Sequence, residues 1–210
     1  MSVIWEAKCK MCRRAGAKLF LKGDRCFSKK CSFETRAFPP GQHGQRNKDR
    51  KITEFATQLR EKQKLRQTYH LREGQFRAYV EEAQRQRGVT GEVLVQLLEM
   101  RLDNVIHRIG WSPSRGQARQ MVDHRFFTVN GKRVNIPSYA VRPGDVIGIH
   151  ESKRSTALAQ ANAGNLVDQN QPKWIAINPQ TFEATVVRTP EPDEVSSEID
   201  VQKIIEFYSR

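Results

Sequence analysis

Four cysteines near the start of the chain have the residue type and the spacing of a metal site. They follow a C-x2-C-x13-C-x4-C pattern and are Cys9, Cys12, Cys26 and Cys31. Two short-spaced pairs bring four soft ligands to one point through two turns and a connecting loop. The pattern predicts one structural zinc ion; an iron–sulfur cluster on the same cysteines, and free or disulfide-bonded thiols, are the alternatives. Because four thiolates leave no coordination position for water, we expect no catalysis by this metal.

The loop that connects the two cysteine pairs is poor in apolar residues. Its only apolar stretch is Leu19-Phe20-Leu21. We therefore expect the metal, rather than a hydrophobic core, to supply the fold of this segment. Basic residues interleave the cysteines, and they would present positive charge to phosphate groups unless they form only a solvated face. These residues are Lys8, Lys10, Arg13, Arg14, Lys18, Lys22, Arg25, Lys29, Lys30 and Arg36.

Positive charge is concentrated in two parts of the chain. The 210 residues include 36 Lys and Arg against 23 Asp and Glu, a formal net charge of +13. Residues 1–90 hold 22 basic and 9 acidic residues, residues 101–154 hold 10 and 4, and residues 155–210 hold 4 and 8. This surplus predicts a polyanionic partner, foremost a nucleic acid. No apolar run approaches the roughly 18 residues of a membrane span, and residues 1–10 lack a signal-peptide core, so we expect a cytoplasmic protein without membrane contact.

A turn-rich linker and a basic tract follow the cysteines. Residues 38–44 read FPPGQHG, a composition typical of a rigid turn. Within the linker, Gln42 and His43 are candidate RNA contacts, because His43 has no local partner for catalysis and suits stacking or phosphate binding. The tract that leads into the next helix contains Arg46, Lys48 and Arg50.

Three helices are predicted after this tract. The first begins with Thr53 as its N-cap, and the second carries an apolar stripe over residues 76–83 and stops at Gly88. The third begins at Thr90 and places leucines as far as Leu102 on one face. These helices would form a small domain that is basic outside. The first helix is expected to expose Arg60, Lys62, Lys64 and Arg66.

Residues 103–150 show a compact pattern of short helices and strands. Helices are predicted at 104–109 and 115–122, and strands at 126–129, 132–134 and 146–149. Asn130-Gly131 is a strong signal for a two-residue hairpin turn. Ala118 and Val122 would face the core, which leaves the cations of their helix outside. The second helix and the hairpin would together form a basic groove that suits the backbone of an RNA duplex.

The fold class expected from these elements is α+β, with an inserted RNA-binding module of short helices and a small antiparallel sheet. Two more strands are predicted at 174–177 and 184–187, and the acidic stretch 191–198 reads as a surface loop rather than a protein-docking patch. The last helix is too short to be stable alone, so it must pack on the first helical domain. The predicted domains are a four-cysteine metal-binding extension at 1–45, a helical domain at 46–98 completed by the C-terminal helix 199–210, an RNA-binding module at 99–165, and strands with the acidic loop packed on the module at 166–198.

Several motifs resemble those of a known family. They occur in the family's order and extend along nearly the whole chain. Four of them resemble the RNA-binding module named after the fourth small-subunit ribosomal protein: RLDN at 101–104, QARQ at 117–120, TVNG at 128–131 and RPGD at 142–145. Three more are similar to that protein's own family, uS-four: PPGQHG at 39–44, LREKQK at 59–64 and EFYSR at 206–210. The cysteine spacing resembles the metal-containing version of the bacterial family.

The resemblance implies a structural constituent of the small ribosomal subunit and not an enzyme. The family binds the 5′ domain of small-subunit (16S) rRNA early in assembly, lies beside neighbouring ribosomal proteins where mRNA enters the subunit, and contributes to translational accuracy. On this resemblance, the residues near mRNA would be Arg46, Lys48 and Arg50. Those that face rRNA in the module would be Arg115, Gln117, Arg119, Gln120 and His124. The hairpin residues Asn130, Lys132 and Arg133 complete the expected RNA surface.

Two other functions are compatible with parts of the sequence. The same module occurs in RNA-modifying enzymes such as pseudouridine synthases, but no other segment of this chain is large enough for a catalytic domain. A zinc-containing DNA-binding regulator would need a dimer interface and a single recognition helix. Here the basic charge covers about half of the chain, as expected for a protein that wraps structured RNA.

Overall fold

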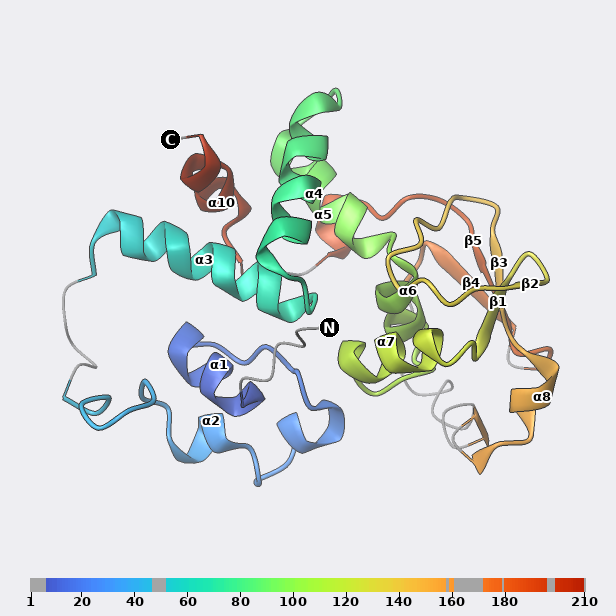
Figure 1. Ribbon diagram of the computed structural model, residues 1–210, viewed down its shortest axis with the longest axis horizontal. Coiled ribbons are helices and arrows are strands. Elements are labelled where there is room, and N and C mark those ends of the chain that lie inside the picture. Colours follow the sequence, from blue (N-terminus) through green and yellow to red (C-terminus); the bar gives the residue numbers. More distant parts are fainter. Residues whose placement is uncertain are drawn as a thin grey trace. The chain divides into compact units, whose positions relative to one another are not determined.

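The computed structural model describes residues 7–46, 52–157, 159–160, 172–178, 180–195 and 199–209. Internal contacts divide the chain into two compact units, one of residues 1–94 with 197–210 and one of residues 95–196. Figure 1 draws the elements of each unit. The first unit joins the cysteine segment (residues 7–46), the helices that follow it and the C-terminal helix, whereas the second joins the module to the strands after it. Within the described ranges, no helix has both the length and the apolar character to cross a bilayer.

Helices are the only regular elements among the described residues of the first unit. They are α1 (Lys8–Ala15), η1 (Gly23–Cys26), α2 (Ser32–Thr35), α3 (Glu54–Thr68), α4 (Glu73–Arg85), α5 (Thr90–Glu99), which continues into the second unit, and α10 (Val201–Tyr208). The hydroxyl of Thr53 caps α3 as predicted, because it accepts a hydrogen bond from the N–H of Ala56 at 3.3 Å. Gly16 ends α1 in the left-handed region, with φ of 72°.

Helix α10 packs along α3, as the shortness of α10 required. This packing corrects one expectation, because Lys62 is only 5% exposed and does not lie on an outer basic face. Its ammonium lies 2.5 Å from the carboxylate of Glu73 and 4.7 Å from the ring centre of Phe207. Lys62 shares with Gln58 and Leu65 the side of α3 that α10 covers, since residues three and four apart lie on one helix face.

The second unit combines short helices with one antiparallel sheet. Its elements are α6 (Leu102–Ile109), α7 (Arg115–Asp123), β1 (Phe127–Val129), β2 (Lys132–Arg133), β3 (Val146–Ile149), α8 (Glu151–Arg154), β4 (Ile175–Asn178), β5 (Glu183–Val186) and η3 (Pro192–Glu194). The leucine stripe that was expected to reach Leu102 in one helix is broken, because α5 ends at Glu99 and Arg101 precedes α6 as its N-cap.

The sheet has five strands in the order β2-β1-β3-β5-β4. Asn130 and Gly131 connect β1 to β2 with φ of 50° and 78°, the positive values that a tight hairpin turn needs. Strands β4 and β5 join the module directly. They extend the module's sheet, because β5 pairs with β3 in the register Ile147 to Ala184.

Helices α6 and α7 pack against each other and share a core with the sheet. Ala118 and Val122 of α7 are both fully buried, which confirms the inward face predicted for this helix. Trp111, between the two helices, stacks on Phe127 of β1 with ring centres 5.8 Å apart and planes 9° apart. This packing fixes α7 relative to the sheet, so the outer side of α7 and the hairpin are held by one core.

Candidate nucleic-acid interface

The cysteine segment has a small core of its own. It consists of four buried residues: Met11, Cys12, Leu19 and Leu21. The sequence predicted no core here, and the cluster forms because Met11 of α1 closes over the two leucines of the loop. Four side chains are few for a segment of 40 residues, so apolar burial alone supplies little of its stability.

The four cysteines are free thiols that lie in this same part of the first unit. Cys12, Cys26 and Cys31 are buried, and Cys9 is half-buried. Burial raises the pKa of Cys12, and the negative charge of each of the other three cysteines raises it further, against a hydrogen bond from the backbone of Leu19. The Sγ of Cys26 also accepts a hydrogen bond from the N–H of Lys22 at 3.3 Å.

The donor set of this segment suits zinc in its chemistry. Cys12 lies close enough to the other three cysteines for their charge to raise its pKa, and soft sulfur ligands are those that zinc and iron–sulfur clusters prefer. Among the residues that the structure describes, no group of three or more His, Cys, Asp or Glu side chains is arranged to hold a metal ion.

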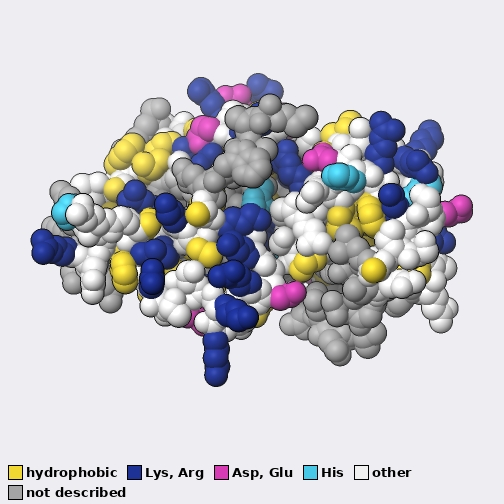
Figure 2. Space-filling model, turned by 60° about the horizontal axis from the view of Figure 1, so that its bottom comes forward, with side chains coloured by type: hydrophobic (Ala, Val, Ile, Leu, Met, Phe, Trp, Pro, Cys, Tyr) yellow, Lys and Arg dark blue, Asp and Glu magenta, His cyan; other side chains and the backbone are white. Residues whose placement is uncertain are grey.

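The basic residues of the cysteine segment divide into two groups. Three have partners within the segment: Lys8 donates to the carbonyl oxygen of Leu21 at 3.2 Å, Arg13 donates to that of Phe38 at 2.9 Å, and Lys18 is paired with Glu34. The others have exposed side chains: Lys10, Arg14, Lys22, Arg25, Lys29, Lys30 and Arg36. Figure 2 shows a face on which Lys and Arg side chains gather, with hydrophobic side chains exposed among them.

Helix α3 exposes fewer cations than the sequence predicted, whereas the candidate RNA contacts of the linker and its basic tract that the structure describes are exposed as expected. Gln42, His43 and Arg46 are exposed, while Lys48 and Arg50 lie outside the described residues. On α3, Arg60 is exposed. The remaining cations of α3 are held by acidic neighbours: Lys64 by Glu61 at 2.7 Å, Arg66 by Glu73 at 3.5 Å, and Lys62 as described above.

The outer side of α7 carries the residues that the sequence assigned to rRNA binding in the module. Gln120 and His124 are exposed, and Arg115, Gln117 and Arg119 are half-buried. The helix begins at Ser114, whose hydroxyl accepts from the N–H of Gln117 at 3.3 Å. Five polar or basic side chains thus lie at or beside one nine-residue helix whose other side is buried in the core.

Two buried carboxylates hold the arginines of this surface. Glu99 is fully buried and accepts two hydrogen bonds from Arg108, at 2.8 Å each, while Arg115 lies 3.9 Å away. Asn104 links them, because its amide nitrogen donates to Glu99 and its amide oxygen accepts from Arg115 at 2.7 Å. Sequence reasoning missed Glu99; a lone carboxylate at the end of the leucine stripe was the signal that could have identified it.

The second carboxylate is Asp103, which is only 4% exposed. It accepts two hydrogen bonds from the buried guanidinium of Arg101, at 3.0 and 2.7 Å, and lies 4.0 Å from Arg119. Buried, bidentate pairs restrict the rotamers of the arginines that they contact. The bidentate pairs here are those of Arg108 with Glu99 and of Arg101 with Asp103. On α7, the hydrogen bond from Arg115 to Asn104 positions its guanidinium before any ligand arrives, which favours phosphate recognition, and Arg119 has a longer contact with Asp103.

The hairpin exposes its two predicted cations, whereas its predicted asparagine is used inside the protein. Lys132 and Arg133 are exposed on β2. Asn130 uses its amide inside the protein, because its oxygen accepts from the N–H of Val146 at 2.9 Å and its nitrogen donates to Asp145 at 2.8 Å. The two cations are thus the groups of the hairpin that can approach a phosphate, and Asn130 shapes the turn that presents them.

His107 of α6 lies beside this arginine network, and its pKa differs strongly between the folded and the unfolded chain. Burial lowers its pKa to about 4, and the charge of Arg115 lowers it further. The ring is therefore neutral at pH 7, and its Nδ1–H donates to the carbonyl oxygen of Ser112 at 3.0 Å. An unfolded chain, with an ordinary histidine pKa of about 6.5, binds this proton more readily than the folded chain does.

We therefore expect stability to fall as pH decreases from 6.5 towards 4. The loss attributable to His107 is about 2 kcal/mol between pH 7 and pH 5, and none is expected above pH 7. Urea unfolding of the wild type and of His107→Gln at the two pH values measures it. The difference between the two proteins should shrink at pH 5, and an equal loss in both would contradict the assignment to His107.

Two family models match consecutive parts of the chain, from residue 5 to residue 147. The Ribosomal protein S4/S9 N-terminal domain matches residues 5–99, and the S4 domain matches residues 100–147. The chain is 50% identical to small ribosomal subunit protein uS4A of Symbiobacterium thermophilum, 50% identical to uS4 of Dictyoglomus thermophilum and 48% identical to uS4 of Heliobacterium modesticaldum. Each alignment spans 202 residues, which is 96% of this chain and 96% of the relative. The cysteine segment lies in the first matched domain, and α7 with the hairpin lies in the second.

Proposed function

The chain belongs to the uS4 family of small ribosomal subunit proteins, and on this ground we propose that it is a structural, non-enzymatic constituent of the small ribosomal subunit that binds rRNA. The observation that carries this function is the similarity to named ribosomal proteins over 96% of the chain. The ribosome of the cytoplasm is accordingly its location. An RNA-modifying enzyme and a DNA-binding regulator, the two alternatives that the sequence left, are set aside.

A finer proposal concerns the RNA that is bound. We infer that the chain binds the 5′ domain of small-subunit (16S) rRNA early in assembly, with the exposed cations of the cysteine segment as one surface and α7 with the hairpin as another. Structured RNA offers several helices to such separate surfaces, which recognise backbone and shape. The exposed Arg46, with Lys48 and Arg50 outside the described residues, would lie near mRNA, and this is the basis of a proposed contribution to translational accuracy.

Binding to a transcript of the small-subunit rRNA 5′ domain tests this proposal. We expect tight binding whose log K falls linearly with log salt, by about 0.7 to 0.9 for each phosphate that Lys or Arg neutralises. Titrations between about 50 and 200 mM salt measure this slope. Duplex DNA of the same length is the control, and equal affinity for it would contradict specific rRNA binding. Chemical footprinting of the transcript then identifies the protected nucleotides.

We also propose that Cys9, Cys12, Cys26 and Cys31 bind one structural zinc ion. The spacing of the cysteines, their location in one segment and the small core of that segment support this proposal. The bound ion would connect α1 to η1 and to the residue that precedes α2, a cross-link that the apolar contacts do not supply. An iron–sulfur cluster would use the same four thiolates, and its brown colour would distinguish it from colourless zinc.

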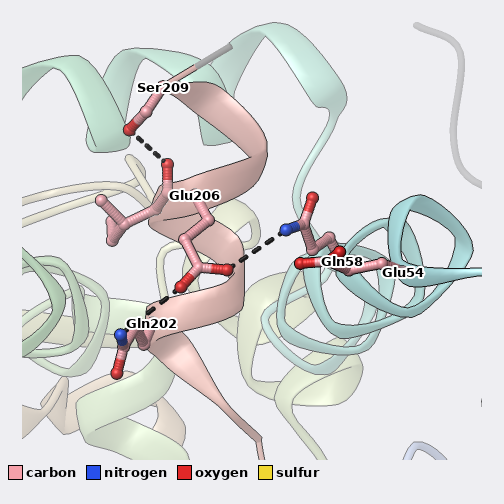
Figure 3. Close-up of a pocket in the computed structure, with 6 residues that line it drawn as sticks. Glu54, Gln58, Gln202, Glu206 and Ser209 are labelled. Carbon is pink, nitrogen blue, oxygen red and sulfur yellow. Dashed lines mark hydrogen bonds between the residues drawn. The ribbon is translucent and has the colours of Figure 1, made fainter.

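A pocket in the first unit is the proposed contact for a neighbouring ribosomal protein. It lies between α3 and α10 and has a volume of about 540 Å³, and Figure 3 shows the side chains that line it. The carboxylate of Glu206 accepts from the amides of Gln58, at 3.1 Å, and Gln202, at 3.4 Å. The Oε1 of Gln58 is buried and has no hydrogen-bond partner among the described residues.

This pocket is rich in acceptors on a chain with a large positive charge. Glu54, Glu206 and the Oε1 of Gln58 can all accept hydrogen bonds, and Ile205 provides an apolar wall. Such a site suits the ammonium or guanidinium of a basic side chain, with its aliphatic stem against Ile205. RNA phosphates would be repelled by the two carboxylates, so the chemistry favours a basic segment of a neighbouring protein.

Replacing Glu206 with Lys tests this contact. We expect binding of the neighbouring small-subunit protein to weaken by about tenfold or more, because an acceptor that lines the pocket is replaced by a charge of the same sign as the basic partner. Affinity of the chain for the rRNA transcript should not decrease. Glu82→Lys on the exposed side of α4 makes the same change of charge away from the pocket and serves as the control. Equal incorporation of the neighbouring protein with both variants would contradict the proposal.

A further inference from the structure

The cysteine segment exposes a stacked pair of aromatic rings. The rings of Phe20 and Phe27 have centroids 5.0 Å apart and an angle of 26° between their planes. Phe20 is 42% exposed and Phe27 is 75% exposed. Neither ring belongs to the small core of Met11, Cys12, Leu19 and Leu21. Large aromatic side chains are usually buried, so an exposed pair on a segment with so few apolar residues requires an explanation.

The backbone turns Phe20 away from that core. Its neighbours Leu19 and Leu21 are 6% and 2% exposed, so both anchor the chain while the ring between them points to the surface. Phe20 itself has φ of 49°, in the left-handed region that non-glycine residues seldom adopt. A strained residue of this kind persists where the surrounding structure imposes it, commonly at a binding site. Phe27 follows the buried Cys26 at the end of η1, which places the second ring beside the first.

The charges around the two rings indicate what they contact. Between Lys18 and Lys30 there are five basic residues and a single acidic one, Asp24. Lys22, Arg25, Lys29 and Lys30 are all exposed. The centre of a protein–protein interface is rich in aromatic residues and poor in charged residues. The surface around Phe20 and Phe27 differs, because it is rich in charged residues. Aromatic faces surrounded by cations are the arrangement with which proteins hold single-stranded nucleic acid, because cations bind the phosphates while bases stack on the rings.

We propose that Phe27, supported from behind by Phe20, stacks on an unpaired nucleobase of the RNA that the chain binds. This inference rests on the proposed rRNA-binding function and adds a site that reads RNA through a base rather than through phosphates. Duplex regions offer no free base face, so the ligand is a loop, bulge or end of the RNA. The surrounding Lys and Arg side chains hold the adjacent phosphates. The stacked geometry gives Phe27 a rigid support.

Substitution of Phe27 in the full chain tests the proposal against the transcript of the rRNA 5′ domain. Phe27→Ala should weaken binding by about tenfold, the effect expected when one base loses its stacking partner, without changing the salt slope. Phe27→Tyr should retain the wild-type affinity, whereas Phe27→Leu should not. Val89→Ala shortens another exposed apolar side chain of the same unit, 63% exposed, and should have no effect. Lys29→Ala should instead reduce the salt slope by about one.

Zero-length ultraviolet cross-linking locates the contact directly. The expected product joins the peptide that contains Phe27 to a nucleotide that the free transcript leaves unpaired. Wild-type affinity of Phe27→Ala, or equal affinities of Phe27→Leu and Phe27→Tyr, would overturn the stacking site and leave the proposed function intact. The stacking site would also be overturned if Phe27→Ala weakened binding of a neighbouring protein and left binding of the transcript unchanged, because the rings would then be a protein contact. Failure of the wild type to prefer the transcript over DNA would overturn the proposed function as well.

Discussion

Removal of the zinc ion proposed for the four cysteines is expected to unfold the cysteine segment and leave the second unit folded. Structural zinc contributes about 10–16 kcal/mol of apparent binding energy to small metal-dependent folds. The apolar core of four residues cannot replace such a contribution, whereas the second unit has a core of its own built from both helices and the sheet. Cys26→Ser should have the same effect as a chelator, because it removes one of four ligands. Limited proteolysis with metal analysis measures both effects.

The expected digestion pattern is specific to one part of the chain. Cleavage after the exposed basic residues of the cysteine segment should accelerate, and cleavage within residues 101–150 should not. Affinity for the rRNA transcript should decrease by about tenfold or more, because several phosphate contacts lose their fixed positions. Added zinc should restore both properties in chelated wild type but not in Cys26→Ser. An unchanged N-terminal digestion pattern after complete removal of metal would rule out the structural role.

Replacement of Glu99 with Ala is expected to destabilise the second unit by about 3–5 kcal/mol, because it removes one partner of a buried ion pair. Arg108 would lose two hydrogen bonds of 2.8 Å, and the amide nitrogen of Asn104 would lose its side-chain acceptor and keep only the backbone carbonyl oxygen of residue 99. The side chain of Arg115 is 14% exposed, and without the carboxylate of Glu99 its guanidinium would lie near Arg108 with no compensating negative charge from that residue. Urea unfolding measures the change in the free energy of unfolding, and titration of the rRNA transcript measures the change in RNA affinity.

A matched variant lies on the same helix. Glu92 is exposed in the first turn of α5, so Glu92→Ala should change stability by only about 0.5 kcal/mol. In conditions where both proteins are folded, Glu99→Ala should also bind the transcript more weakly, because Arg115 and Arg108 are no longer held. Similar unfolding curves for the two variants would show that the buried carboxylate does not organise this surface.

Local signals in the sequence predicted much of the fold correctly. Thr53 caps a helix because its hydroxyl satisfies a backbone N–H three residues on, a contact that needs no distant partner. Asn130 and Gly131 form a hairpin turn because both tolerate positive φ. Ala118 and Val122 face the core because helical spacing puts them on one side. Each of these outcomes depends on residues within a few positions of one another.

Other features depended on contacts between distant residues. Lys62 was predicted on an exposed face, and α10, some 140 residues later in the chain, covers it. Strands β4 and β5 were recognised as strands, but their addition to the module's sheet follows from pairing with β3. The pocket between α3 and α10 joins residues 148 positions apart, which no local pattern could have brought together.

Residue types and their spacing are enough to predict a cysteine pattern suited to a metal, to locate two regions of positive charge, and to identify the motifs of the uS4 family. The packing of distant elements determines which of these groups are exposed to a ligand. Lys62 is buried, Asn130 closes a turn, and two buried carboxylates hold the arginines of α7. The physical reason is that residue type and spacing are local properties, whereas exposure and ion pairing depend on which distant elements pack together. The exposure of the Phe20 and Phe27 rings is likewise a consequence of tertiary packing.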